Sequence, residues 1–383
     1  DWLVLALLIA GYLLLFFSFY PSTYGIEDEI GFIGEAVIMS RGALSEEGAG
    51  LSGFEGIIER GGRHVPNRNP GRPLLTVPFL LLFGERSVFV SGAMIHACLA
   101  LLFALTVCEF GASPLWGVLI LFHPTLAIYS RTVMGDPPAA LFLLASFFFL
   151  VRRQPQYLLA GICSGLAAVM RYQCGIVVPF VLLALWRRKE REKWTYLVGS
   201  AVIGLFIAAY NLYLYRALTN QPNGYFDFSS FVYHLLLYGG ILSCIWPLAF
   251  WVPLFSKFGG HKKLVFAFCV PFFLLMCAWY FNDRQESWYG TMIVAPRLII
   301  PCLAVWFVPY AVWLEQKLKL LRLPWLRLAA TAGCAAMLVA VQFFIFNQHQ
   351  RHLDRLQAAK VELINLVPAG SLVIAEGALP KMF

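Results

Sequence analysis

Long apolar runs, separated by short polar segments, fill the chain up to about position 346. A run of about 20 residues crosses the hydrocarbon core of a bilayer, and shorter runs suffice where Pro or Gly interrupts them. About eleven runs meet this criterion. They cover residues 2–20, 87–108, 114–129, 137–151, 157–170, 174–186, 194–215, 231–255, 264–281, 298–314 and 328–346. The pattern predicts an all-α polytopic membrane protein with about eleven transmembrane helices.

Between the first and second runs lies the longest polar stretch of this part of the chain, residues 21–86. It opens with three carboxylates, Glu27, Asp28 and Glu29, beside a hydrocarbon surface, where charge is costly unless it has a function. Near-helical apolar spacing at 30–39 predicts a short helix in the interface, and 73–83 predicts a second interfacial or re-entrant helix. The glycine-rich residues 42–62 predict a flexible segment. We interpret 21–86 as the catalytic outer loop of a membrane enzyme.

The chain changes character after the last run. Residues 352–366 are amphipathic, a turn is expected at 367–370, and 371–375 has the composition of a strand. We expect residues 1–346 to form the transmembrane domain and residues 347–383 to begin a small extracytoplasmic α/β subdomain that is cut short. Residues 2–20 lack a basic segment and a small-residue cleavage site, so they predict a membrane anchor.

Composition agrees with a bilayer protein. The chain is 60% hydrophobic and 13% charged, with a mean hydropathy of +0.72, values that exclude disorder and an ordinary soluble domain. The net charge of +8 is explained by Lys and Arg retained in cytoplasmic loops, so nucleic acid is not implied. The nine cysteines lie in or beside apolar runs without metal-ligand spacing, so we expect no disulfide and no structural zinc.

Compact basic clusters set the expected orientation. They lie at 152–153, 187–189, 257–263 and 317–327, and all four alternate onto one face, which the positive-inside rule makes cytoplasmic. The N-terminus is then inside and the C-terminus outside. The carboxylates of the 21–86 loop and several arginines share the extracytoplasmic face. We expect a bacterial inner (plasma) membrane protein with its active site on that face.

Several short motifs occur in a distinctive order. They are Asp28-Glu29 with Ala36 further on, Arg72-Pro73-Leu74-Leu75, Tyr129-Ser130-Arg131 leading to Asp136-Pro137, Gly165 to Arg171, and Pro296-Arg297-Leu298 to Pro301. This order resembles the GT-C superfamily of polyprenyl-phosphate-sugar-dependent glycosyltransferases, and most closely the group of protein O-mannosyltransferases and lipid A aminoarabinose transferases. The resemblance covers most of the chain. Arg72 and Arg171 stand where aminoarabinose transferases commonly have lysine, so the substrate is not carried over.

The resemblance implies roles for individual residues. Asp28 corresponds to the base that activates the acceptor hydroxyl, Glu29 to its neighbour and Asp136 to a second catalytic acid. The donor phosphate is assigned to four arginines: Arg72, Arg131, Arg171 and Arg297. The resemblance implies an inverting displacement of a sugar from a polyprenyl phosphate to a lipid, glycan or protein acceptor. Whether a divalent cation, Mg or Mn, assists is left open, and so are its ligands.

Other interpretations of these residues stay open. The acids at 27–29 also suit a solvated helix N-terminus, and Asp136 before a proline pair suits a helix cap. The arginines also suit interfacial side chains that pair with membrane lipid phosphates. A transporter or flippase is a second function class, although no internal repeat is visible. An O-antigen ligase or polymerase and a non-catalytic assembly subunit are further alternatives.

Overall fold

The computed structural model describes residues 1–47, 57–60, 63–186, 189–217, 226, 228–256, 258–278, 295–320 and 324–366, and these are mainly helical, as predicted. The α-helices are α1 (Trp2–Ser18), α2 (Glu27–Ser40), α3 (Gly71–Phe83), α4 (Val90–Cys108), α5 (Val118–Leu121), α6 (Pro124–Tyr129), α7 (Asp136–Val151), α8 (Tyr157–Met170), α9 (Val177–Ala184), α10 (Glu190–Tyr215), α11 (Phe231–Ile245), α12 (Trp251–Phe255), α13 (Lys262–Cys277), α14 (Ile300–Leu320) and α15 (Pro324–Leu366). Short 3-10 helices are η2 (Glu85–Ser87), η3 (Pro114–Gly117), η4 (Tyr172–Ile176), η5 (Phe228–Ser230), η6 (Gly259–His261) and η8 (Ala295–Ile299).

Five helices in the described part of the chain are long and apolar enough to cross a membrane. They are Glu85–Cys108, Glu190–Tyr215, Phe228–Ile245, Gly259–Cys277 and Pro296–Leu320. Two predicted runs are broken rather than continuous: 114–129 becomes η3, α5 and α6, and 231–255 becomes α11 and α12. Prolines explain both breaks, because Pro124 starts α6 and Trp246, before Pro247, has an extended backbone. The polytopic membrane architecture is confirmed, and the number eleven stays a prediction.

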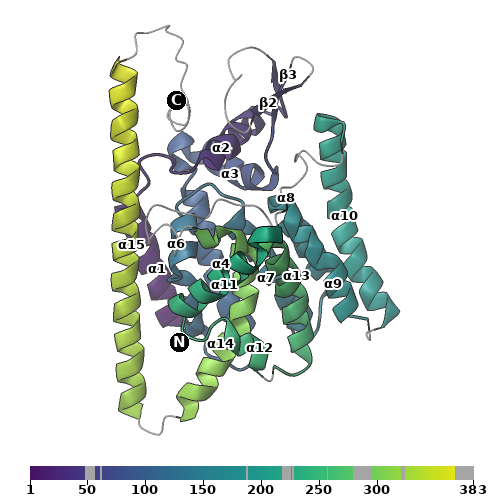
Figure 1. Ribbon diagram of the computed structural model, residues 1–383, viewed down its shortest axis with the longest axis vertical. Coiled ribbons are helices and arrows are strands. Elements are labelled where there is room, and N and C mark those ends of the chain that lie inside the picture. The colour runs from purple at the N-terminus through teal and green to yellow at the C-terminus, as the bar shows by residue number, and fades with distance from the viewer. Residues whose placement is uncertain are drawn as a thin grey trace.

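Both helices predicted in the 21–86 loop are present as α2 and α3. They lie at the upper end of the molecule beside a small sheet (Figure 1). The sheet consists of β1 (Glu46–Glu47), β2 (Ile57–Arg60) and β3 (Arg63–Pro66) in the antiparallel order β1-β3-β2. Of the segment 42–62, residues 46–47 and 57–60 are strands, and residues 48–56 and 61–62 lie outside the described part of the chain, so its flexibility stays a prediction. Local glycine content did not reveal that Val65 and Ile58 pack with Tyr210 and Leu214 of α10.

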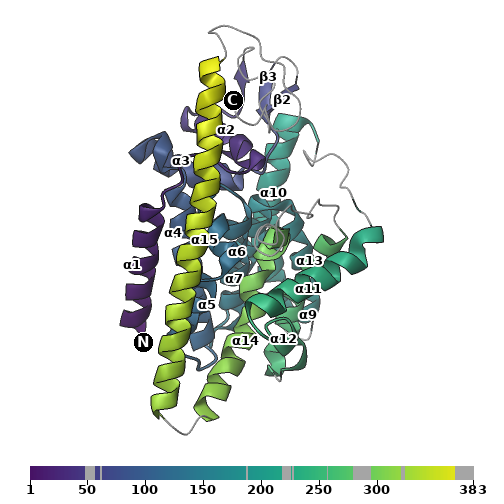
Figure 2. The ribbon, with the colours of Figure 1, turned by 60° about the vertical axis from the view of Figure 1, so that its left-hand side comes forward.

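The last helix is longer than expected. α15 runs for 43 residues without a break and passes along the whole height of the molecule (Figures 1 and 2). At about 1.5 Å per residue it is roughly twice as long as the hydrocarbon core is thick. The predicted last span and the amphipathic segment 352–366 are thus parts of one helix, and the boundary expected at 346 falls inside it. The strand expected at 371–375 lies outside the described residues. α1 begins in the lower half of the molecule in Figure 1, whereas α15 ends at the top.

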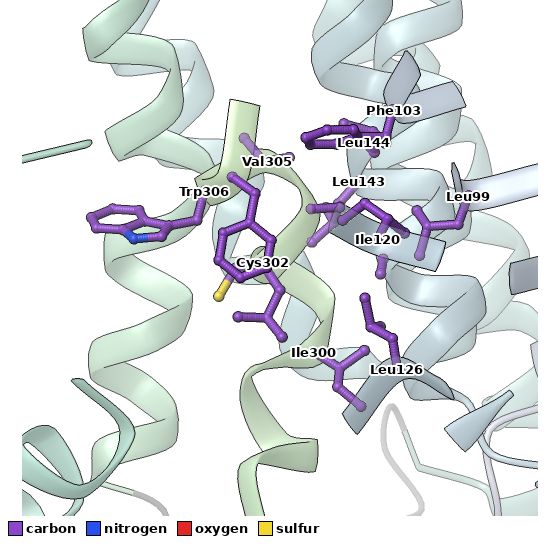
Figure 3. Close-up of a cluster of buried hydrophobic side chains, with 14 of the residues drawn as sticks. Leu99, Phe103, Ile120, Leu126, Leu143, Leu144, Ile300, Cys302, Val305 and Trp306 are labelled. Atoms are coloured by element: carbon purple, nitrogen blue, oxygen red, sulfur yellow. The ribbon is translucent and has the colours of Figure 1, made fainter. Parts of the chain in front are cut away.

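One part of the core lies where α14 packs against α7 and α4, which also pack against each other (Figure 3). Its side chains are apolar and almost completely buried. They include Leu99, Phe103, Ile120, Leu126, Leu143, Leu144, Ile300, Cys302, Val305 and Trp306. Because α14 follows η8 directly, this packing fixes the position of Arg297 in η8.

Glycines allow close helix contacts around α8. A Cβ added at Gly161 would overlap the Tyr196 carbonyl, and one at Gly199 would come within 2.5 Å of the Leu158 carbonyl. α8 and α10 therefore approach each other backbone to backbone, as small residues permit in membrane helices. At the other end of α8, Gly71 at the start of α3 and Gly135 just before α7 approach the carbonyls of Val169 and Met170 in the same way.

Candidate active site

A mainly polar cavity of about 120 Å³ lies where the first turn of α2, the segment after β3, the start of α7 and the end of α8 meet η8. Its lining residues are Asp28, Phe32, Asn67, Arg68, Asn69, Met134, Gly135, Asp136, Met170, Arg171, Gln173 and Arg297. Four of the seven predicted site residues are thus brought together: Asp28, Asp136, Arg171 and Arg297. They come from four separate segments of the chain.

Asp28 lies in the first turn of α2, where the helix dipole favours an acid. Its two carboxylate oxygens form ion pairs with Arg68 at 2.9 Å and with Arg297 at 3.0 Å. The Asp28 side chain keeps 23% of its surface exposed, so it borders the cavity rather than lying beneath it. Arg297 is in turn hydrogen-bonded to the buried Tyr129. Two guanidinium groups therefore fix the direction of the Asp28 carboxylate.

Asp136 is the first residue of α7 and forms an ion pair with Arg171, which follows the last residue of α8. Backbone packing sets this pair. A Cβ added at Gly135 would lie 2.7 Å from the Met170 carbonyl oxygen, so the start of α7 touches the end of α8. Asn69 also donates a hydrogen bond of 3.2 Å to that oxygen. The start of α7 and the segment before α3 therefore both contact the end of α8, beside the cavity.

The cavity lining carries more cations than anions. Three arginines, Arg68, Arg171 and Arg297, face two aspartates, Asp28 and Asp136. The charges of Arg171 and Arg297 act on each other and on Asp28. Guanidinium forks bind phosphate oxygens in bidentate geometry, and carboxylates accept protons from hydroxyl groups. The arrangement suits an anionic phosphate ester together with a hydroxyl that must be deprotonated.

Glu29 lies next to Asp28 in sequence but has a different environment. It is fully buried, and its carboxylate accepts hydrogen bonds from the backbone N–H groups of Gly25 at 2.9 Å, Ile26 at 3.0 Å and Val133 at 2.7 Å. Burial raises the pKa of Glu29 from 4.5 to about 7, and these donors and the nearby Arg72 charge oppose that rise. Glu29 does not line the cavity. It ties the start of α2 to the segment that leads to Asp136.

Arg72 also lies away from the cavity lining. The sequence suggested an arginine presented by a loop, but Arg72 is fully buried in the first turn of α3. Its Nη2 donates a hydrogen bond of 3.3 Å to the Thr132 carbonyl, while Glu29 supplies the counter-charge. Arg72 and Glu29 therefore hold the 132–133 backbone from two sides.

Arg131 points toward a different part of the molecule. Its guanidinium donates to the carbonyls of Phe19 and Phe346 and contacts the side chains of His349 and Gln350. It is buried and does not line the cavity. Arg131 thus joins the end of α1 and the middle of α15 to the segment that follows α6.

Several residues that line the cavity were not among the predicted site residues. Asn67, Arg68 and Asn69 form a polar segment before Pro70-Gly71, and none of the motifs predicted from the sequence includes them. Gln173 follows the predicted Arg171 by two positions. The available signal was a cluster of polar residues immediately before the start of an interfacial helix.

Comparison with known proteins decides the fold. No protein-family model matches the chain, and no curated protein matches it. Two crystal structures of ArnT from Cupriavidus metallidurans do match: the apo state at 15% identity and the state bound to undecaprenyl phosphate at 16%, each with a TM-score of 0.53 over 88% of this chain. ArnT is a lipid A aminoarabinose transferase of the GT-C group. The chain has the GT-C membrane glycosyltransferase fold.

The GT-C fold was the expectation from the motif order, and the structural match confirms it. The chain spans 63% of the apo ArnT chain and 64% of the lipid-bound one. In this chain the polar cavity lies between α2, the start of α7, the end of α8 and η8, and its lining residues come from both halves of the chain.

Proposed function

We propose that this protein is a membrane glycosyltransferase that moves a sugar from a polyprenyl-phosphate donor to an acceptor hydroxyl. The observation that carries the proposal is the cavity with Asp28 and Asp136 among three arginines. Support comes from the fold shared with an ArnT structure that holds undecaprenyl phosphate. A phosphate ester and a hydroxyl are the two groups that this combination of side chains would serve.

The proposed step is a single displacement. The acceptor hydroxyl gives its proton to the Asp28 carboxylate while its oxygen attacks the anomeric carbon of the donor sugar. The bond from that carbon to the phosphate oxygen breaks, and the electron pair leaves with the phosphate. Because attack and departure occur on opposite sides of the carbon, the configuration inverts.

The arginines would act on the leaving phosphate. Arg68 and Arg297 pair with Asp28 and could turn toward a donor phosphate, which would leave the Asp28 carboxylate less tightly paired and a better base. Arg171 would contribute a third cation, held in place by Asp136. Charge stabilisation of this kind contributes about 10²–10³ in rate for each donor.

We further propose that the cavity faces the extracytoplasmic side of a bacterial inner membrane, as the positive-inside rule suggests. The acceptor would be a lipid, a glycan or a protein. We also propose that residues 1–346 form the catalytic unit, with 21–86 as its catalytic loop. In this arrangement Glu29, Arg72 and Arg131 support the segment that leads to Asp136 rather than touch the donor.

The experiment that tests the function measures lipid binding and sugar transfer on the same purified protein. Undecaprenyl phosphate is the binding probe, and a panel of undecaprenyl-phosphate sugars supplies donors. Asp28→Asn should reduce transfer by about 10²–10⁴-fold because the amide cannot accept the proton. Binding of undecaprenyl phosphate should be retained or tightened, since Arg68 and Arg297 lose a competing carboxylate. Glu109→Gln, an exposed acid at the end of α4, is the matched control.

The rival functions predict other results. A non-catalytic assembly subunit would tolerate Asp28→Asn in every assay. A transporter would bind the lipid and move it across vesicles without cleaving the sugar from it. Absence of undecaprenyl phosphate binding, or full transfer by Asp28→Asn protein, would overturn the proposal.

A further inference from the structure

A second acid lies behind Asp28 on the same helix. Glu35 is seven residues further along α2, so about two turns separate the two carboxylates, and both are on one face. Phe32, one turn after Asp28, lines the cavity between them. Unlike Asp28, Glu35 is fully buried. The catalytic step proposed above does not use it.

The surroundings of Glu35 are unusual for a buried acid. One oxygen, Oε1, accepts a hydrogen bond of 2.9 Å from the Tyr210 hydroxyl of α10, and the other, Oε2, has no hydrogen-bond partner among the described residues. Tyr172 of η4 lies within its electrostatic influence and donates a hydrogen bond of 3.0 Å to Asn211. The remaining charged group that acts on Glu35 is Arg68.

The charge of Arg68 therefore acts on two carboxylates. It forms an ion pair with Asp28 at 2.9 Å on the cavity side, and its charge acts on Glu35 on the buried side. The segment that carries it is anchored, because the Tyr215 hydroxyl donates to the Pro66 carbonyl and Val65 packs on Tyr210. Any exchange of Arg68 between the two acids would therefore be a movement of its side chain on an anchored backbone.

We propose that Glu35 is a positioning residue whose ionisation state decides whether Arg68 stays at the cavity with Asp28 or is drawn inward, away from the donor phosphate. The consequence for lipid binding rests on the proposed function, whereas the movement of Arg68 does not. A neutral Glu35 has no charge with which to compete for Arg68. An ionised Glu35 competes strongly, because a buried carboxylate without a second partner is costly.

The pH range follows from the burial of Glu35. Desolvation raises the pKa of Glu35 from 4.5 to about 8, although the Tyr210 hydrogen bond and the Arg68 charge lower it. At pH 6.5 Glu35 is neutral and Arg68 serves the cavity. At pH 9 only about one molecule in ten keeps the proton. If the protonated form is the one that binds, the affinity for a lipid phosphate falls by up to about tenfold.

The test uses the full chain in detergent and two readouts between pH 6.5 and pH 9. The first is modification of Arg68 by phenylglyoxal, located by mass spectrometry and normalised to the exposed Arg153. The second is binding of undecaprenyl phosphate, expressed as the ratio of Glu35→Gln to wild type. This ratio cancels the second ionisation of the lipid phosphate itself, whose pKa is near 6.

Glu35→Gln has the shape of the neutral acid. We expect it to match wild type at pH 6.5, to keep constant Arg68 labelling at higher pH, and to bind the lipid up to about tenfold more tightly than wild type at pH 9. Tyr210→Phe removes a hydrogen-bond donor to Glu35, so the pH at which Arg68 labelling changes should be higher in this variant than in wild type. A purely structural Glu35 would give no such shift.

The possible failures can be told apart. Wild-type labelling of Arg68 that does not change relative to Arg153 across this range would overturn the inference, as would identical pH profiles for wild type and Glu35→Gln. If no variant binds undecaprenyl phosphate but Arg68 labelling follows Glu35 as described, the proposed function fails and the positioning role stands.

Discussion

Replacement of Glu29 by glutamine tests whether α2 holds the segment that leads to Asp136. Three backbone N–H groups, from Gly25, Ile26 and Val133, donate to the two oxygens of this buried carboxylate. Glutamine keeps one oxygen and places an NH₂ group where the other was. At least one of the three N–H groups then faces a donor, and a stranded buried N–H group costs about 1–3 kcal/mol.

The amide also removes the counter-charge of the buried Arg72. We therefore expect Glu29→Gln to lower the free energy of unfolding by about 2–4 kcal/mol and Glu29→Ala by about 3–6 kcal/mol. Asp28→Asn, one position earlier, is the control: its ion pairs are partly exposed and are worth at most about 1 kcal/mol each. The assay is thermal unfolding in detergent, followed by tryptophan fluorescence.

The ranking of the two variants decides the outcome. Glu29→Gln should melt several degrees below wild type and Asp28→Asn close to it, whereas transfer activity should fall in both. If Glu29→Gln has the same melting temperature as wild type, the hydrogen bonds that Gly25, Ile26 and Val133 donate to Glu29 contribute little to stability. If Asp28→Asn melts equally low, the division between a catalytic and a supporting acid is wrong.

Three further predictions concern stability. Arg131→Met should destabilise the protein by about 3–5 kcal/mol and expose α15 to protease, because the carbonyls of Phe19 and Phe346 lose a buried donor. The control is Arg153→Met at an exposed site, which should change neither stability nor protease sensitivity. The melting temperature should fall as pH rises from 6 to 9, and it should fall less steeply in Glu35→Gln. The reason is that folding raises the pKa of Glu35 from 4.5 to about 8. The stability that this group contributes is complete below pH 4.5 and is lost as the pH rises through 8. Gly135→Ala should lower both melting temperature and undecaprenyl phosphate binding, because its Cβ would lie 2.7 Å from the Met170 carbonyl; a variant with unchanged binding would contradict the packing argument.

The sequence predicted the local features of this protein well. Apolar runs gave helices because a segment in hydrocarbon must satisfy its own backbone. The spacing at 30–39 gave α2, and the run at 73–83 gave α3. α2 begins at Glu27, so the acids at 27–29 do lie at a helix N-terminus, which was the alternative interpretation of them. The motif order predicted the GT-C fold.

Local patterns did not predict which arginines face the cavity. Arg72 and Arg131 were expected at the donor phosphate, but both are buried elsewhere, whereas Arg68 was overlooked. Arg68, Arg72 and Arg131 look alike in the sequence, since each is a long cation in a short segment between apolar runs. Their directions depend on what packs against them, namely Thr132 for Arg72 and α15 for Arg131.

The sequence by itself determined which residue types were available and that they belong to a membrane bundle, because hydrophobicity and helical period are local properties. Only the tertiary structure decided which of them meet. Asp28 and Arg297 are 269 positions apart and yet 3.0 Å from each other. Their contact depends on the packing of α14 against α7 and α4. It also depends on Gly135, which lets the start of α7 touch the end of α8. A pairing across that distance is set by the packing of whole helices, which no local pattern records.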